Sequence, residues 1–250
     1  MIPILLIGAP GTGKTAAVRA RYTHTEVLLL SAAAEEDVAG LPYIIDGRER
    51  RTTPAFVERL QAAARQHGPA ACCLFLDELD KARREVADTL LTLVTHPESY
   101  GIPAGVAIVA ACNPPEWGGG DGISEPMLSR FAAVRWQPQV AVVADYLAAR
   151  HGPAGEYIAD GLRTGRIPLY ETAGEGLGQR ITCPRTYELA LRAMVEPSPL
   201  APLDLVLAGL LTVNAASYLA AYSTPAGPVE VKARRVAARR QATAQPVRVP

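Results

Sequence analysis

A short apolar run that leads directly into a glycine-rich loop constrains this chain more than any other feature. Residues 2–7 read Ile-Pro-Ile-Leu-Leu-Ile, and the loop Gly-Ala-Pro-Gly-Thr-Gly-Lys-Thr follows at residues 8–15. Such a run is typical of a strand buried on both faces of a parallel sheet. Glycines let backbone N–H groups close around a polyphosphate, and the positive end of a following helix favours the same anion.

The loop fits the pattern G-x-x-x-x-G-K-[ST], which binds the phosphates of a nucleotide. We expect Lys14 to reach the β- and γ-phosphates of ATP, and Thr15 to hold Mg²⁺. The backbone around the phosphates is expected to come from Gly8, Ala9, Pro10, Gly11, Thr12 and Gly13. The alternative is a glycine-rich turn with a solvated lysine, and the strand and helix around the loop argue against it.

A second apolar run, residues 72–76, ends in the carboxylates Asp77 and Glu78. Parallel sheets place ligand sites at the carboxyl ends of their strands. We therefore expect Asp77 to hold Mg²⁺ through water, and Glu78 to orient the attacking water or accept its proton. An isolated acidic pair could equally begin a helix, but beside a phosphate loop the chemical role is favoured. For Asp80 and Lys81, a solvated helix start and a subunit contact are equally open.

Strand and helix patterns alternate through the first half of the chain. Strands are predicted at residues 2–7, 26–30, 72–76, 106–112 and 132–136. Helices are predicted at residues 13–22, 54–67 and 83–95, and residues 32–53 are predicted to be irregular. Glycines 118, 119, 120 and 122 predict a flexible loop. This alternation predicts an α/β fold with a parallel sheet covered by helices on both faces.

The pattern changes after Pro138, where no strong strand signal remains. Helices are predicted at residues 140–150, 184–195 and 203–222. We therefore predict a phosphate-loop α/β domain at residues 1–137, a small all-helical lid domain at 138–225, and a flexible basic tail at 226–250. The tail arginines 234, 235, 239 and 240 are candidates for contact with nucleic acid or an acidic partner.

Composition excludes several classes of protein. Apolar residues make up 49% of the 250, and 25 basic residues balance 25 acidic ones, so a globally basic nucleic-acid coat is excluded while a local patch is not. Four cysteines without a C-x-x-C pair favour a reduced, cytoplasmic protein without zinc. The apolar run 205–222 contains Thr212, Asn214 and Ser217, and it predicts a buried helix rather than a membrane span.

Together these motifs resemble the AAA+ class of P-loop ATPases, and three later segments add to the resemblance. Residues 109–114 look like the sensor-1 strand with Asn113 at its tip, and residues 125–131 look like the arginine-finger segment with Arg130. Residues 183–186 open a helix and look like sensor 2 with Arg185. Segments 37–42 and 106–115 are similar to those of the MoxR-like group, and the resemblance covers residues 2–222.

The resemblance implies a role for each of these side chains. Asn113 would bond the γ-phosphate or the attacking water, although a strand-end turn is the alternative. Arg130 would stabilise charge on the phosphates of a neighbouring subunit, which implies a ring, most often a hexamer; an ordinary surface arginine is the alternative. Arg185 would sense the γ-phosphate from the lid, with the same alternative. Related ATPases use a segment before the first strand to hold adenine, and the first strand here starts at Ile2, which leaves base selectivity open.

The predicted function is that of an Mg-ATP-hydrolysing, MoxR-like motor or chaperone that acts on a protein partner, such as a von Willebrand factor A-type protein. Residues 36–53 form an insertion in which Tyr43 would grip a substrate chain in the ring's pore; packing under a long loop is equally open. One alternative is a motor or clamp-loader-like ATPase that acts on DNA, which the zero net charge disfavours. The other is an assembly scaffold with negligible hydrolysis, against which Glu78 argues.

Overall fold

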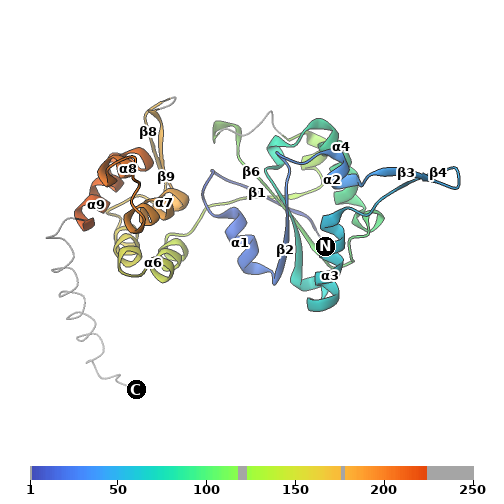
Figure 1. Cartoon of the computed structure of the whole chain (residues 1–250), viewed down its shortest axis with the longest axis horizontal. Coiled ribbons are helices and arrows are strands. Elements are labelled where there is room, and N and C mark those ends of the chain that lie inside the picture. The colour runs from blue at the N-terminus through green and yellow to red at the C-terminus, as the bar shows by residue number, and fades with distance from the viewer. Residues whose placement is uncertain (1, 118–122, 176–177, 224–250) are drawn as a thin grey trace, which may run out of the picture. The chain divides into compact units, whose positions relative to one another are not determined.

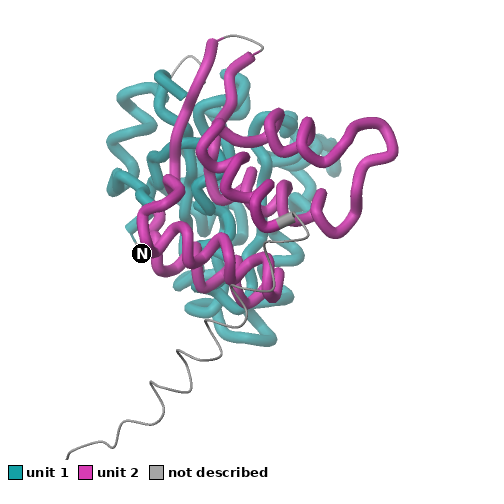
Figure 2. Tube along the Cα trace, turned by 90° about the vertical axis from the view of Figure 1, so that its left-hand side faces the viewer, with its two compact units in different colours: residues 1–137 teal, residues 138–250 magenta. Residues whose placement is uncertain are grey.

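The computed structural model describes residues 2–117, 123–175 and 178–223. The chain divides into two compact units, Met1–Gln137 and Pro138–Pro250 (Figure 2). The predicted loop glycines 118, 119, 120 and 122 and the predicted tail, 226–250 with its arginines, lie outside the described residues.

A five-stranded parallel sheet forms the centre of the first unit, as predicted. Its strands, in chain order, are β1 (Ile4–Ile7), β2 (His24–Leu29), β5 (Cys72–Asp77), β6 (Ala107–Cys112) and β7 (Ala132–Arg135). In space the order is β2-β5-β6-β1-β7, so the strand before the phosphate loop lies between β6 and β7. The register pairs Ile7 with Cys112 on one side and with Arg135 on the other, which brings the carboxyl ends of these strands to one edge.

Alternate side chains of the strands point to two separate apolar cores. Leu74 and Leu76 pack into one core, which four helices of this unit close (Figure 1). These helices are α2 (Glu35–Ala39), α3 (Ala55–His67), α4 (Arg84–Thr95) and α5 (Glu125–Leu128). Cys73 and Phe75 point to the opposite face, where Val18 of α1 (Lys14–Arg21) covers them. Apolar cores thus lie on both faces of the sheet, although the edge strand β7 is itself exposed, and the α/β prediction is confirmed.

Short 3₁₀ turns link the main elements of this unit. They are η1 (Pro69–Ala71), η2 (Leu79–Lys81), η3 (Pro97–Tyr100) and η4 (Pro115–Trp117). The turn η2 directly follows the acidic end of β5, and η3 leads from α4 toward β6.

The prediction that residues 32–53 are irregular was wrong. After the short helix α2, the chain forms an antiparallel hairpin of β3 (Pro42–Ile45) and β4 (Arg48–Arg51). The turn between the strands is Asp46-Gly47, and both residues have positive φ, at 51° and 70°. Asp-Gly in this conformation matches the right-handed twist of a hairpin, so the dipeptide was the signal that the sequence analysis missed.

The second unit is mainly helical, with one short sheet that the sequence analysis did not predict. Its helices are α6 (Val140–Arg163), α7 (Pro184–Val195), α8 (Leu203–Leu210) and α9 (Val213–Ser223), and their apolar faces form a single core. The added sheet is a hairpin of β8 (Glu171–Ala173) and β9 (Arg180–Thr182), so this unit is not all-helical.

Two predicted helices of the second unit also needed correction. Helix α6 continues to Arg163, beyond the predicted end at residue 150, through a kink at Gly152. The predicted helix 203–222 is two helices, because Leu211 is extended and the Thr212 N–H donates to Thr182 Oγ1 (2.9 Å). Within the described ranges, no helix combines the length and the apolar character needed to span a bilayer.

Candidate functional site

The phosphate loop connects β1 to α1 at the carboxyl edge of the sheet. Gly11 and Gly13 have φ of 73° and 86°, a conformation that costs side-chain-bearing residues free energy but is open to glycine. Gly13 is the N-cap of α1, so the first backbone N–H groups of that helix lie next to the loop. A helix N-terminus beside a glycine-rich loop favours an anion through its dipole and through N–H groups that lack helical partners.

Lys14 is buried and its ammonium lies inside the loop. Its Nζ donates to the carbonyl oxygens of Gly8 (2.7 Å) and Ala9 (3.1 Å), and to Asn113 Oδ1 (2.9 Å). Asn113 follows β6, so the sheet brings together two of the predicted residues that lie far apart in the sequence. The result is a fixed positive charge with an amide beside it, which suits a terminal phosphate of a nucleotide.

Thr15 and Asp77 also meet at this edge. The Thr15 hydroxyl donates to Asp77 Oδ2 at 2.9 Å, while Asp77 Oδ1 accepts the Glu78 backbone N–H at 3.0 Å. A hydroxyl and a carboxylate oxygen are hard ligands of the kind that Mg²⁺ prefers. These two side chains therefore fit the predicted magnesium site through the chemistry of their donors.

Glu78 has a left-handed backbone conformation, with φ 59° and ψ 45°. A residue other than glycine in this region costs about 1–3 kcal/mol, and such strain is concentrated at functional sites. The carboxylate is one-third exposed, and its Oε1 lies 3.4 Å from Lys81 Nζ. Glu78 therefore has access to solvent beside Asp77, as a water-orienting base requires.

Asp80 has a role that the sequence analysis missed. It is only 6% exposed, so the solvated helix start, one of the two readings left open for it, was wrong. Its Oδ1 accepts the backbone N–H of Asn113 at 3.2 Å. Because Asn113 Oδ1 in turn accepts from Lys14, Asp80 positions the amide next to the loop lysine. No local pattern reveals a contact between the end of β5 and the end of β6.

Trp136 is the second residue that the sequence analysis missed. Its indole Nε1 donates to the carbonyl of Thr12 at 3.1 Å, and its backbone N–H donates to the carbonyl of Ile7 at 2.7 Å. A Cβ added to Gly8 would lie 2.7 Å from the Trp136 carbonyl oxygen, closer than real contacts allow. Trp136 therefore contacts the loop at its beginning and near its end, and Gly8 has no side chain because the backbone after β7 lies against it.

Burial raises the pKa of two thiols in the central sheet. It raises the pKa of Cys112 to about 11, with Asp80 adding to the rise and Lys14 opposing it. Burial likewise raises the pKa of Cys73 to about 12. Both thiols are therefore protonated at neutral pH and act as small apolar side chains.

The remaining predicted residues lie elsewhere. Arg130 donates from Nε to the Leu91 carbonyl (3.1 Å) and to Thr95 Oγ1 (2.9 Å), and from Nη1 to the Pro126 carbonyl. In the part of the chain that the structure describes, none of its hydrogen bonds reaches the phosphate loop. Arg185 is an exposed residue in the first turn of α7, in the second unit.

Tyr43 lies on β3 and is 42% exposed. The alternative that it packs beneath a long loop is therefore wrong. The hairpin that carries it belongs to the first unit but lies away from the phosphate loop (Figure 1).

Comparison with known proteins identifies the region around this site. Residues 4–139 match the family described as "ATPase family associated with various cellular activities (AAA)". The ATP-dependent zinc metalloprotease FtsH of Syntrophus aciditrophicus (strain SB) is 33% identical over 124 residues, which cover 45% of this chain and 16% of that protein. The proteasome-activating nucleotidase of Methanosarcina mazei is 31% identical, over 45% of this chain and 27% of that protein.

The chain thus spans less than a third of the length of these curated relatives. Among solved structures, the Thermotoga maritima RuvB Holliday junction branch migration motor aligns with a TM-score of 0.44 and 16% identity. That alignment covers 88% of this chain and 61% of the RuvB chain.

Proposed function

This chain belongs to the AAA family of ATPases, and from that premise we propose that it binds Mg-ATP at the carboxyl edge of its sheet and hydrolyses it. The observation that carries the proposal is the meeting of two pairs at one edge. Lys14 Nζ lies 2.9 Å from Asn113 Oδ1, and Thr15 Oγ1 lies 2.9 Å from Asp77 Oδ2. A turn with a solvated lysine would give neither pair.

In the proposed reaction, water attacks the γ-phosphorus of ATP, and the bond to the β,γ-bridging oxygen breaks to leave ADP and phosphate. Glu78 orients the water and takes its proton at a carboxylate oxygen. Lys14 and Asn113 bind the γ-phosphate oxygens. Thr15 and Asp77 would hold Mg²⁺, which when bound offsets the charge of the phosphates.

We propose that Arg130 acts in trans, completing the site of the next subunit in a ring, most often a hexamer. Its partners at the end of α4 hold the guanidinium on the unit's own surface, beside the Pro126 carbonyl. A fixed planar guanidinium suits charge stabilisation at a phosphate supplied by another subunit. Arg185, exposed at the start of α7, is proposed to contact the γ-phosphate from the lid and to couple the lid to the nucleotide state.

We further propose that the target of the ring is a protein, and that the chain is of the MoxR-like type with a von Willebrand factor A-type partner. Relatives named as an ATP-dependent protease and a proteasome-activating nucleotidase favour a protein target. Four buried free thiols support a reducing compartment such as the cytoplasm.

The zinc chemistry named for the FtsH relatives is not part of this proposal. None of the four histidines begins a His-Glu-x-x-His motif. Over the described ranges, no group of three His, Cys, Asp or Glu side chains could hold a metal ion.

A DNA-acting motor remains the alternative if the tail arginines bind nucleic acid. Salt-sensitive binding that vanishes when residues 226–250 are removed would favour it. If the target is a protein, as we propose, an unfolded protein raises ATP turnover, whereas double-stranded DNA does not.

The main test compares ATP turnover per subunit across protein concentration, with Mg²⁺, for the wild type and Glu78→Gln. The wild type is expected to turn over faster as concentration rises, because each site is completed by a neighbour. Glu78→Gln is expected to bind ATP with unchanged affinity and to lose at least about 100-fold in turnover, since the amide accepts no proton. Equal turnover in both proteins would instead support the scaffold with negligible hydrolysis.

A further inference from the structure

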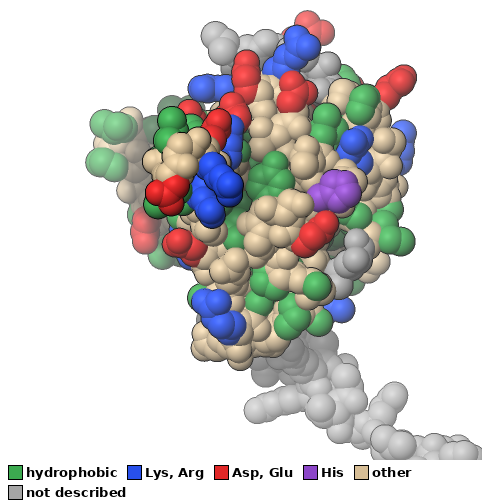
Figure 3. Space-filling view, turned by 90° about the vertical axis from the view of Figure 1, so that its right-hand side faces the viewer, with side chains coloured by type: hydrophobic (Ala, Val, Ile, Leu, Met, Phe, Trp, Pro, Cys, Tyr) green, Lys and Arg blue, Asp and Glu red, His purple; other side chains and the backbone are tan. Residues whose placement is uncertain are grey.

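The β3–β4 hairpin is exposed along its whole length. Every residue from 41 to 53 is exposed, including Leu41 (59%), Ile44 (78%) and Ile45 (49%). A two-stranded hairpin without a covering layer is marginally stable in water, and an exposed apolar group of this kind marks an interaction surface. The hairpin projects from the first unit (Figure 1), and in the view from that side charged and apolar side chains lie together on it (Figure 3).

The strand register separates the hairpin into two faces. Tyr43 pairs with Arg50 and Ile45 pairs with Arg48, so these four side chains share one face, which we call the basic face. Ile44 and Glu49 form a pair on the opposite face. Among the residues described, the structure records no ion pair for Arg48 or Arg50, so the basic face presents two guanidinium groups beside apolar side chains.

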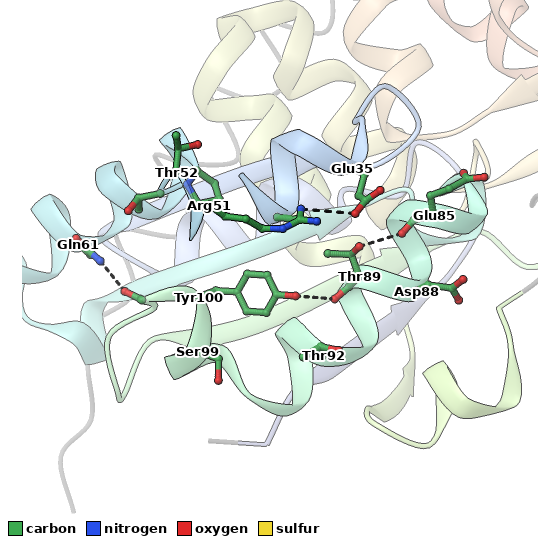
Figure 4. A pocket seen from close by; sticks show the side chains of 14 residues that line it. Glu35, Arg51, Thr52, Gln61, Glu85, Asp88, Thr89, Thr92, Ser99 and Tyr100 are labelled. Atoms are coloured by element: carbon green, nitrogen blue, oxygen red, sulfur yellow. Dashed lines mark hydrogen bonds and ion pairs between the residues drawn. The ribbon is translucent and has the colours of Figure 1, made fainter. Parts of the chain in front are cut away.

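An open pocket of about 900 Å³ with the opposite charge lies at the base of the same hairpin. Glu35, Glu85 and Asp88 line it together with a single cation, Arg51, and with the ring of Tyr100 (Figure 4). Arg51 Nη1 lies 3.7 Å from Glu35 Oε1, so the one cation of the pocket is paired with Glu35. The other two carboxylates, Glu85 and Asp88 of α4, have no ion pair recorded within the described ranges.

The pocket's groups suit a guanidinium. The Tyr100 hydroxyl donates to the Thr89 carbonyl at 3.4 Å, which orients the ring within the pocket. Carboxylates bind the planar fork of an arginine, and an aromatic ring stacks on its face. The pocket is therefore complementary in charge and in chemistry to the basic face.

We propose that the basic face docks in this pocket of a second copy of the chain. Arg51 and Thr52, at the base of the hairpin, are part of the lining of the pocket. The strands are four residues long and place the tip of the hairpin about 13 Å from this base. The hairpin therefore cannot fold back to fill its own pocket. In the docked pair, Arg48 and Arg50 bind Glu85 and Asp88 of the next copy. Such a head-to-tail contact leaves a free hairpin at one end and a free pocket at the other, and a ring closes both. The inference rests on the ring assembly proposed above and names the contact that builds it.

The test uses charge reversal, with assembly of the full chain measured by sedimentation velocity in Mg-ATP. R48E/R50E and E85R/D88R are each expected to raise the concentration for half-assembly by at least about tenfold, because like charges then face each other. The combination of all four changes is expected to restore assembly to within about threefold of the wild type. Glu49→Lys, on the opposite face, is the matched control and is expected to leave assembly unchanged.

Cross-linking gives a second readout that does not depend on overall stability. All four native cysteines are buried, so single Arg48→Cys and Glu85→Cys proteins each carry one exposed thiol. A short bismaleimide is expected to join a mixture of the two proteins into dimers, and to join neither protein alone.

The docking is overturned if R48E/R50E assembles at the same concentration as the wild type. It is also overturned if the mixture of Arg48→Cys and Glu85→Cys gives no cross-linked dimer. Either result would instead favour a substrate chain, gripped by Tyr43, as the partner of the hairpin. Calorimetry of ATP binding on the same samples keeps the two proposals separate, since loss of docking with intact ATP binding leaves the ATPase proposal standing.

Discussion

The phosphate-loop edge and the β3–β4 hairpin belong to the same unit, but they are held in opposite ways. At the edge, Lys14 and Asp80 are buried, and hydrogen bonds link the ends of β1, β5, β6 and β7. On the hairpin, every residue is exposed. The comparison teaches that the chain holds the phosphate-loop edge with its own hydrogen bonds, whereas no part of the described chain covers the hairpin. Each prediction below tests one side of this contrast.

The largest expected effect is on ATP binding, from a substitution of Lys14 in the phosphate loop. Lys14→Ala removes the only side-chain ammonium within the phosphate loop and is expected to weaken ATP binding by at least about 100-fold, because the lost contacts are charge-assisted. Isothermal calorimetry measures the change. Arg19→Ala, an exposed cation on the same helix, is the control, and equal losses in the two variants would show that general charge rather than the loop binds the nucleotide.

A smaller effect is expected where one side chain positions another. Asp80→Ala removes the acceptor for the Asn113 N–H and is expected to lower kcat about tenfold while ATP affinity stays within threefold, since Asn113 would lose its orientation. Asp80→Asn keeps an oxygen acceptor and is expected to recover most of the rate. A fall in affinity that matches the fall in kcat would indicate a general structural defect instead.

Trp136→Phe tests the hydrogen bond between the Trp136 indole and the phosphate loop. The phenyl ring keeps the packing but loses the hydrogen bond to the Thr12 carbonyl, and a neutral bond of this kind contributes about 1 kcal/mol. We expect about a fivefold loss of ATP affinity. Trp117→Phe is the control, and an unchanged affinity in Trp136→Phe would mean that the loop keeps its shape without the indole.

The smallest effect is expected on the hairpin. Ile45→Ala is expected to change the free energy of unfolding by less than about 0.5 kcal/mol, because Ile45 is 49% exposed and belongs to none of the apolar cores that the described residues form. Leu90→Ala, at a fully buried position of α4, is expected to cost about 2–5 kcal/mol in the same denaturant titration. A large cost for Ile45→Ala at low protein concentration would contradict the comparison, since it would show that the hairpin packs within its own chain.

The features that the sequence predicted are those encoded by neighbouring residues. The loop with Lys14 and Thr15, and the acidic end of β5, each occupy a few consecutive positions whose chemistry identifies them. The parallel sheet could be predicted because short apolar segments alternate with segments of helical periodicity along the first half of the chain.

The features that it did not predict depend on contacts between distant segments or on weak turn signals. Asp80 binds Asn113 and Trp136 binds Thr12 through pairs that only the strand order β5-β6-β1-β7 brings together. The Asp46-Gly47 turn and the kink at Gly152 had local signals, but the apolar strand beside the turn is short and the kink lies within a continuous helical pattern.

The close approach of Gly8 to Trp136 has a consequence for how sequences of this kind can diverge. A side chain at position 8 would collide with the backbone at position 136, 2.7 Å from its carbonyl oxygen, so the first position can gain bulk only if the second segment moves. Every residue carries a backbone carbonyl, so no substitution at position 136 removes this collision, and we expect glycine to persist at position 8 while position 136 varies. The codon for residue 8 would then be constrained by a segment that lies at the opposite end of the ATPase unit.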